Sequence, residues 1–206
     1  MASHPKNIIF LSCDAFGVLP PIAKLTPEQA MYHFMSGYTA KVAGTERGVT
    51  EPTPNFSACF GAVFLPLHPT RYAELLKEKL EKHGAQAWLI NSGWSGGAYG
   101  TGNRMSLKIT RGCVNAILDG TTTNTTWEKD PVFGFEIPTS IPNVDPNVLH
   151  PKKAWADPVE YDATQAKLAA MYVKNFEKYK DGDVDYTKFG PQISLTQSFC
   201  IASGAD

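Results

Sequence analysis

Residues 36–61 contain charged and hydroxyl side chains but show neither a helical nor a strand-like hydrophobic pattern. Glycine, proline and threonine are too frequent there for a helix, and apolar residues do not alternate as in a strand. Gly44 and Gly48 can act as two hinges, and a charged tip between hinges can grip a ligand. That tip consists of Thr45, Glu46 and Arg47. Because aromatic residues flank the tip, we predict a functional loop and not a solvated one.

Asp14 is the second candidate, because it follows an apolar run at residues 8–11. Such a run is typical of a strand that is buried on both faces. In open α/β sheets, ligands gather beyond the carboxyl ends of the strands. Asp14 could therefore face a ligand, or it could be a carboxylate that caps a turn. The sequence leaves both interpretations open.

Residues 92–102 are rich in glycine but match neither of two phosphate-binding motifs. A P-loop would continue with lysine and a hydroxyl residue, where this chain has Asn103 and Arg104. A dinucleotide fingerprint would have its third glycine where this chain has Met105. The motif comparison therefore predicts a turn-rich loop and no phosphate cradle.

Histidine and cysteine spacing predicts no metal site and no disulfide framework. The five histidines contain no His-x-x-x-His pair, and the four cysteines are far apart without a Cys-x-x-Cys pair. We interpret the histidines as structural and the cysteines as reduced intracellular thiols, which predicts a cytoplasmic location.

Length and composition indicate a soluble globular protein of one domain or slightly more. Its 206 residues are 43% hydrophobic and 19% charged, which is enough to build a core. A formal net charge of -1 without a basic block argues against nucleic-acid binding. The start of the chain does not resemble a secretory signal, and the apolar runs are far shorter than a membrane span.

Hydrophobic periodicity predicts an α/β fold. Strands are expected near 7–12 and 86–91, and helices near 27–36, 70–83, 110–118 and 158–179. Thr26 and Gln29 form a capping box, Pro27 occupies the first helical position, and Asp157 caps the last helix. The succession of strand, helix and strand indicates a βαβ unit.

Two of these helices have predicted apolar faces. The face of helix 70–83 is expected to consist of Tyr72, Leu75, Leu76 and Leu80. The face of helix 110–118 is expected to consist of Cys113, Val114, Ile117 and Leu118.

Residues 7–21 and 44–52 together resemble ATP-dependent phosphoenolpyruvate carboxykinase. The second run reads Gly-Thr-Glu-Arg-Gly-Val-Thr-Glu-Pro, which is close to unique to that family, where it forms the lid over the active site. The resemblance extends from about Asn7 to about Tyr179 and covers the C-terminal part of the family's much longer protein. It implies a mononucleotide-binding-type α/β domain at residues 1–180, with a mixed sheet, flanking helices and a lid loop at about 38–61. Residues 181–206 are expected to be a loosely ordered tail.

The resemblance also implies a site and a reaction. Arg104, Met105 and Thr110 match family positions that contact ATP on its base and ribose side, while Thr45, Glu46 and Arg47 would support catalysis from the lid. The family converts oxaloacetate and ATP to phosphoenolpyruvate, carbon dioxide and ADP in gluconeogenesis, using Mg²⁺ and Mn²⁺. Asn103 and Gly112 depart modestly from the family pattern, and Gly112 weakens its helix.

The family's P-loop, metal ligands and oxaloacetate-binding arginines are expected upstream of Met1. Two hypotheses follow. The chain is the C-terminal portion of the enzyme and supplies the lid and the adenine-side contacts, or it is a non-catalytic truncated nucleotide-binding or interaction module. The oligomeric state stays open.

Overall fold

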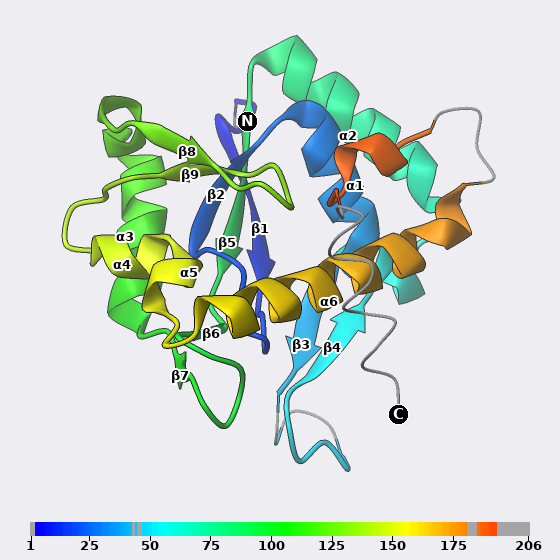
Figure 1. Cartoon of the computed structure of the whole chain (residues 1–206). Coiled ribbons are helices and arrows are strands. Elements are labelled where there is room, and N and C mark those ends of the chain that lie inside the picture. Colours follow the sequence, from blue (N-terminus) through cyan, green and yellow to red (C-terminus); the bar gives the residue numbers. More distant parts are fainter. Residues whose placement is uncertain (1–2, 43, 45–46, 181–184, 193–206) are drawn as a thin grey trace.

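A computed structural model describes residues 3–42, 44, 47–180 and 185–192 of the chain. Its centre is a five-stranded mixed sheet with the order β1-β5-β2-β9-β8 (Figure 1). The strands are β1 (Asn7–Ser12), β2 (Ile22–Leu25), β5 (Gln86–Asn91), β8 (Trp127–Lys129) and β9 (Glu136–Pro138). β1 and β5 are parallel, and the other pairings are antiparallel. The predicted α/β class is therefore confirmed.

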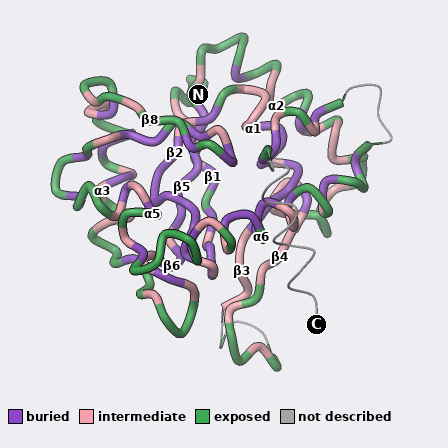
Figure 2. Tube along the Cα trace, viewed as in Figure 1, coloured by how far each residue is buried: buried purple, intermediate pink, exposed green. Residues whose placement is uncertain are grey.

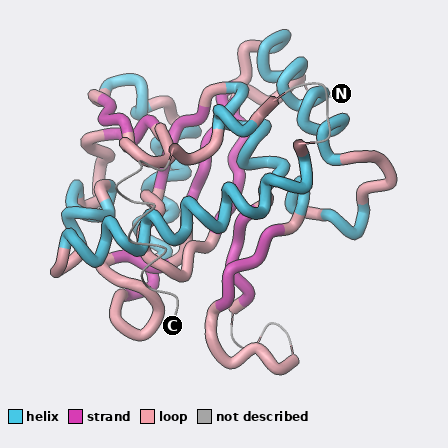
Figure 3. The backbone as a smooth tube through the Cα atoms, turned by 45° about the vertical axis from the view of Figure 1, so that its right-hand side comes forward, coloured by secondary structure: helices cyan, strands magenta, loops and turns pink. Residues whose placement is uncertain are grey.

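Helices cover both faces of this sheet (Figures 1 and 3). They are α1 (Pro27–Ser36), α2 (Pro69–His83), α3 (Leu107–Leu118), α4 (Pro146–Leu149), α5 (Pro151–Ala154) and α6 (Pro158–Phe176). Side chains of β5 alternate between two apolar cores, as a pleated strand requires. Leu89 packs in the larger core with α1 and α6, whereas Trp88 and Ile90 pack in the smaller core with α3.

The strands at 7–12 and 86–91 have the predicted bounds, but the expectation that residues 8–11 are buried on both faces is wrong. Leu11 is 63% exposed because β1 is an edge strand of the sheet. β2 is not predicted by the sequence pattern. It is only four residues long and follows Pro20 and Pro21, so it lacks the length from which an alternation can be recognised.

The predicted helix starts depend on caps that the structure contains. Thr26 Oγ1 accepts a hydrogen bond from Gln29 N, and Gln29 Oε1 accepts one from Thr26 N. Asp157 likewise caps α6. The predicted start of α3 is wrong by three residues, because the Ser106 side chain caps a helix that begins at Leu107.

The predicted apolar faces are wrong at one residue each. Leu75 on α2 is 53% exposed, and Leu118 at the last position of α3 is 67% exposed. Ala73 and Leu80 are the buried residues of α2. The sequence pattern of one helix places both leucines at the margin of its apolar stripe. It does not show how much of that stripe the neighbouring elements cover.

Two short hairpins extend from the main sheet. β3 (Tyr38–Lys41) pairs with β4 (Thr53–Phe56), and β6 (Trp94–Ser95) pairs with β7 (Asn103–Arg104). The prediction that residues 36–61 contain no strand is therefore wrong. Pro54 is tolerated in β4 because every strand of a two-stranded ribbon is an edge strand. The burial pattern shows that each hairpin is most exposed at its tip (Figure 2).

Residues 185–192 lie against the main body. Tyr186 is 7% exposed, and Gln192 N donates a hydrogen bond to Val132 O at 2.8 Å. The remaining residues of the expected tail, 181–184 and 193–206, lie outside the described part of the chain. Within the described part, no helix has the length and apolar character needed to cross a membrane.

His33 on α1 is an unusual core residue. It is 2% exposed and lies between the rings of Tyr32, Phe135 and Tyr172, with centroid distances of 5.5, 4.9 and 5.4 Å. Neither ring nitrogen has a hydrogen-bond partner among the described residues. Burial lowers the pKa of His33 from its ordinary value of 6.5 to about 3, because an imidazolium ion would have no water here.

This burial makes the stability of the protein depend on pH. Below pH 6.5 the unfolded chain binds a proton at His33, while the folded chain stays neutral until about pH 3. The free energy of unfolding should therefore fall as pH drops through this window, by up to about 1.4 kcal/mol per pH unit from this group. His33→Phe should remove that slope, as measured by urea unfolding between pH 7.5 and 4.5. The exposed His4→Gln variant should keep it, and an unchanged slope in His33→Phe would contradict the assignment.

Candidate active-site edge

A buried carboxylate, Asp14, lies directly beyond the carboxyl end of β1 and is fully buried. Its Oδ2 accepts hydrogen bonds from Val18 N at 2.8 Å and Leu19 N at 2.9 Å. Its Oδ1 accepts from Phe16 N and from the Tyr38 hydroxyl, both at 2.9 Å. The carboxylate thus holds the turn that follows β1 and also holds the base of the β3–β4 hairpin.

Asn91 at the end of β5 completes this arrangement. Its Oδ1 accepts from Asp14 N and Gly93 N at 2.9 Å, and its Nδ2 donates to Leu19 O at 2.9 Å. Because β1 and β5 are parallel, their carboxyl ends lie side by side, and the two side chains tie the following loops together. The parallel pairing of the two predicted strands is the signal from which this contact could have been inferred.

Burial raises the pKa of Asp14, and the hydrogen bonds from Leu19, Phe16, Val18 and Tyr38 oppose that rise. The partners of the carboxylate are three backbone N–H groups of the turn after β1 and the hydroxyl of Tyr38 in β3, and no part of the side chain is exposed. Of the two interpretations that the sequence left open, the structure supports the turn-capping carboxylate. Asp14 positions the loops of this edge.

The glycine-rich loop between β6 and β7 packs closely on the turn after β1. A Cβ atom on Gly17 would lie 2.1 Å from Gly97 O, and one on Gly93 would lie 2.1 Å from Asp14 O. Tyr99 N also donates to Ala15 O at 2.9 Å. Glycine is therefore required at positions 17 and 93 because the two backbones approach each other without room for a side chain.

The three predicted nucleotide residues lie on one continuous segment that leads from β7 into α3. Arg104 is exposed, and its Cζ lies 5.5 Å from the ring centroid of Trp94. Met105 is only 8% exposed, so its side chain mainly contributes packing. Thr110 lies in the first turn of α3 and is partly buried. Trp94 was not singled out by the sequence, because a lone tryptophan in a glycine-rich loop has no distinctive spacing.

The predicted lid tip is described only in part. Arg47 is exposed in a turn, whereas Thr45 and Glu46 lie outside the described residues. Gly44 and Gly48 have φ angles of 81° and 86°, which glycine adopts more readily than other residues. The β3–β4 stem and the β6–β7 hairpin extend from the same edge of the sheet (Figures 1 and 3).

No metal site can be built from the residues that the structure describes, since they contain no group of three or more histidine, cysteine, aspartate or glutamate side chains placed to hold an ion. The described cysteines, Cys13, Cys59 and Cys113, are free thiols. The Mg²⁺ or Mn²⁺ that the resemblance implies therefore has no ligand set in the described part of this chain.

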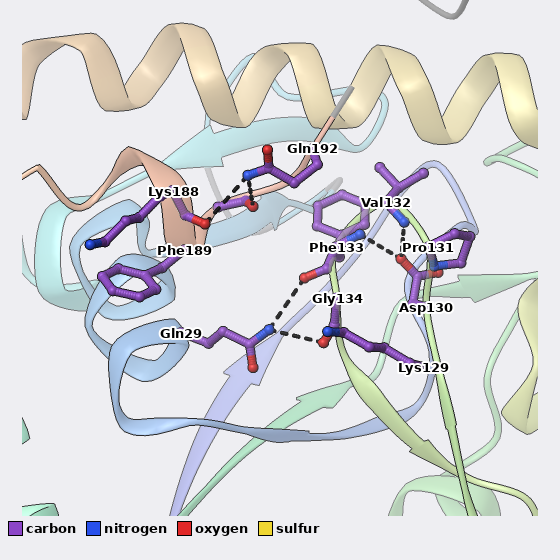
Figure 4. A pocket seen from close by; sticks show the side chains of 11 residues that line it. Gln29, Lys129, Asp130, Pro131, Val132, Phe133, Gly134, Lys188, Phe189 and Gln192 are labelled. Atoms are coloured by element: carbon purple, nitrogen blue, oxygen red, sulfur yellow. Dashed lines mark hydrogen bonds between the residues drawn. The ribbon is translucent and has the colours of Figure 1, made fainter. Parts of the chain in front are cut away.

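A pocket of about 450 Å³ lies between the start of α1 and the turn at residues 130–134 (Figure 4). Gln29 Nε2 donates to Gly134 O at 2.9 Å, and Asp130 Oδ1 accepts from Val132 N at 3.0 Å. Leu25 precedes this helix and is paired with Ala87 at the start of β5. The pocket therefore lies toward the opposite edge of the sheet from Asp14, and the side chains of Gln29 and Asp130 bond to backbone groups that line it.

Comparison with known proteins agrees with the sequence resemblance. A family model described as phosphoenolpyruvate carboxykinase matches residues 1–147. Proteins named phosphoenolpyruvate carboxykinase (ATP) from Cereibacter sphaeroides ATCC 17025 and Campylobacter jejuni NCTC 11168 are each 58% identical, over 193 and 194 residues. The one from Sulfurimonas denitrificans is 55% identical over 194 residues. These matches cover 92 or 93% of this chain but only 36 or 37% of the relatives, so the chain spans little more than a third of their length.

Replacement of Asp14 tests how far this edge depends on one carboxylate. In Asp14→Asn, an amide NH₂ group would face two of the four donors, which would then be buried without an acceptor. We expect the free energy of unfolding to fall by about 2–6 kcal/mol, since each unsatisfied buried donor costs about 1–3 kcal/mol.

Chemical unfolding measures this loss, and hydrogen exchange of Val18 and Leu19 should accelerate. The matched control is Asp119→Asn, an exposed carboxylate that also accepts from a backbone N–H, that of Thr121. This control should change stability by less than about 0.5 kcal/mol. Equal effects of the two substitutions would contradict the structural importance of Asp14.

Proposed function

The chain belongs to the ATP-dependent phosphoenolpyruvate carboxykinase family, and we propose that it supplies the lid and the adenine-side contacts of that enzyme. In this proposal, residues 1–180 are the C-terminal, mononucleotide-binding-type domain. The lid is the β3–β4 hairpin with its connecting loop, within the interval of about 38–61. The observation that carries the proposal is the exposed Arg104, held over Trp94 at the same edge of the sheet as the hairpin.

The proposed reaction converts oxaloacetate and ATP to phosphoenolpyruvate, carbon dioxide and ADP. A carbon–carbon bond breaks as carbon dioxide leaves, and its electrons form an enolate. The enolate oxygen attacks the γ-phosphorus of ATP, and the bond from that phosphorus to the ADP oxygen breaks. Positioning and charge stabilisation carry such transfers, so the residues of this chain would act by orienting ATP and excluding water.

Arg104 is proposed to contact the base and ribose side of ATP. Its guanidinium group is planar and cationic, so it can stack on a base or donate to oxygen. Thr110 would offer a hydroxyl group, and Met105 would support the segment from beneath. The phosphate cradle and the metal ligands would come from parts of the complete enzyme that do not correspond to this chain, which predicts weak ATP binding by the chain alone.

The lid is proposed to act through the loop between β3 and β4. The paired stem, with Tyr38 opposite Phe56 and Lys41 opposite Thr53, restricts any closing movement to the residues between Lys41 and Thr53. A closed lid would exclude water and protect the enolate from protonation to pyruvate. Arg47 at the tip, with Thr45 and Glu46, would contact the ligand.

Grafting separates this proposal from the alternative of a non-catalytic nucleotide-binding module. The chain should replace the corresponding segment of the Cereibacter sphaeroides relative, to which it is 58% identical. The chimera should form phosphoenolpyruvate from oxaloacetate with ATP and Mn²⁺, and the chain alone should not. A folded chimera without activity would favour the non-catalytic module.

Arg104→Ala should weaken ATP binding. Loss of a charged hydrogen-bonding partner corresponds to about 1.5–3 kcal/mol, or roughly tenfold to a hundredfold in the dissociation constant. The measurement is an ATP titration followed by NMR of the 206-residue chain and by KM in the chimera. Arg111→Ala, which removes an exposed arginine of α3, is the matched control and should bind ATP like the wild type. Unchanged affinity in a folded Arg104→Ala variant would refute the contact.

Replacing Gly44 and Gly48 by proline should slow turnover of the chimera while the sheet stays folded. Proline fixes φ near -65°, which excludes the positive φ angles of both residues and restricts any closing movement. More pyruvate should form relative to phosphoenolpyruvate, as product analysis would show. The double asparagine variant is the control, since asparagine tolerates positive φ. Equal turnover and product ratio in both variants would remove the basis of the lid proposal.

A further inference from the structure

We propose that Trp94 is a positioning residue that holds the guanidinium group of Arg104 in place for the nucleotide. This inference rests on the proposed contact between Arg104 and ATP. It adds a residue that neither the glycine-rich motif comparison nor the family resemblance singles out. Trp94 would act through Arg104 and would not itself touch the ligand.

The hairpin register places the two residues together. Trp94 on β6 pairs directly with Arg104 on β7, and the guanidinium Cζ lies 5.5 Å from the ring centroid. This distance is within the range of about 6 Å at which a cation is attracted to an aromatic face. Trp94 is 7% exposed, whereas Arg104 is exposed. The cation therefore remains available to a ligand while the ring beneath it does not.

The indole ring is itself held by the buried network of this edge. Trp94 N donates to Asp14 O at 2.8 Å, and Met105 N donates to Gly93 O at 2.8 Å. Tyr99 packs against the ring edge-on, with centroids 5.6 Å apart and an interplanar angle of 84°. These backbone hydrogen bonds fix the backbone on either side of the Trp94–Arg104 pair, and the Tyr99 ring supports one edge of the indole.

The aromatic face is one of three restraints on the arginine side chain. Its side chain has two further contacts. Nε donates to Ser92 O at 3.4 Å, longer than the usual 2.7–3.2 Å, and the guanidinium group also interacts with the Cys13 thiol, whose pKa it lowers against the effect of burial. An exposed arginine loses side-chain entropy when a ligand fixes it. A platform that restricts the guanidinium group beforehand reduces this loss and so strengthens binding.

Trp94 is a buried apolar residue that packs within its own hairpin region. Among the described residues, the two apolar cores of the protein are built without it. Its recorded ring partners are Tyr99 and Arg104, which both belong to its own hairpin region. A tryptophan outside the cores, with a cation on its face, fits a supporting function for that cation.

Three variants of the 206-residue chain test the proposal, each titrated with ATP and followed by NMR. Trp94→Leu removes the aromatic face but keeps an apolar side chain, and Trp94→Phe restores a smaller face. A cation–π contact at an exposed site contributes about 0.5–1 kcal/mol, so Trp94→Leu should raise the dissociation constant about twofold to fivefold. Trp94→Phe should recover most of the affinity. The third variant, Trp94→Leu combined with Arg104→Ala, should bind like Arg104→Ala alone, because Trp94 acts through the arginine.

A second readout does not depend on ATP. The ring current of Trp94 should shift the side-chain Hε resonance of Arg104 upfield in the free chain, and Trp94→Leu should remove this shift. Trp127→Leu is the matched control, because Lys24 Nζ lies 5.6 Å from the Trp127 ring at another part of the sheet. It removes an equivalent contact and should leave both ATP affinity and the Arg104 resonance unchanged.

The outcomes separate this inference from the proposed function. If Arg104→Ala weakens binding but folded Trp94→Leu binds like the wild type, the positioning function is overturned and the nucleotide contact stands. Additional weakening in the double variant would show that Trp94 acts independently, which also overturns it. If ATP causes no shift in the wild type, the nucleotide proposal fails for this chain, and the Arg104 resonance still decides whether Trp94 holds the guanidinium group.

Discussion

The buried carboxylate of Asp14 is the interaction on which this edge of the protein depends. Placing a charge or a protonated acid where no surface is exposed costs free energy, which only a full set of hydrogen bonds offsets. Four donors provide that set, three from the turn after β1 and one from Tyr38. Because the donors belong to separate segments, satisfying the carboxylate also fixes the relative placement of those segments. The hydrogen-bonding requirement of the Asp14 carboxylate thus fixes the turn after β1 relative to the β3–β4 hairpin.

That constraint links two hairpins that have different proposed tasks. The hydroxyl of Tyr38 at the base of β3 contacts the Asp14 side chain, while Trp94 at β6 contacts its backbone oxygen. On the other side, the ring of Tyr38 lies 5.2 Å from that of Tyr172 on α6. The proposed lid stem and the proposed nucleotide segment are therefore both bonded to Asp14.

The features that sequence predicted well are those set by neighbouring residues. The cap at Thr26, the cap at Asp157 and the strand at 86–91 each follow from a few adjacent side chains. The features that it missed depend on distant partners. β2 is a strand because β5 and β9 lie beside it, and β3 pairs with β4 across a loop that has no alternating pattern. Likewise the proposed function of Trp94 depends on Arg104, which lies opposite Trp94 in the β6–β7 hairpin. The nucleotide residues were predicted from family resemblance, and the structure adds the exposure of Arg104 and its contact with Trp94.

The parallel pairing of β1 and β5 has a consequence for how the protein folds. Asn7 lies opposite Gln86, so the two partners are 79 residues apart in the sequence. The segment between them includes the α-helices α1 and α2 and the β3–β4 hairpin. Closing so long a loop costs chain entropy before the pairing can repay it. Helices α1 and α2 can form early from local contacts, whereas the pairing of β1 with β5 requires the chain as far as Asn91. Until then β1 lacks its partner strand, and an unpaired strand with an exposed apolar side favours aggregation.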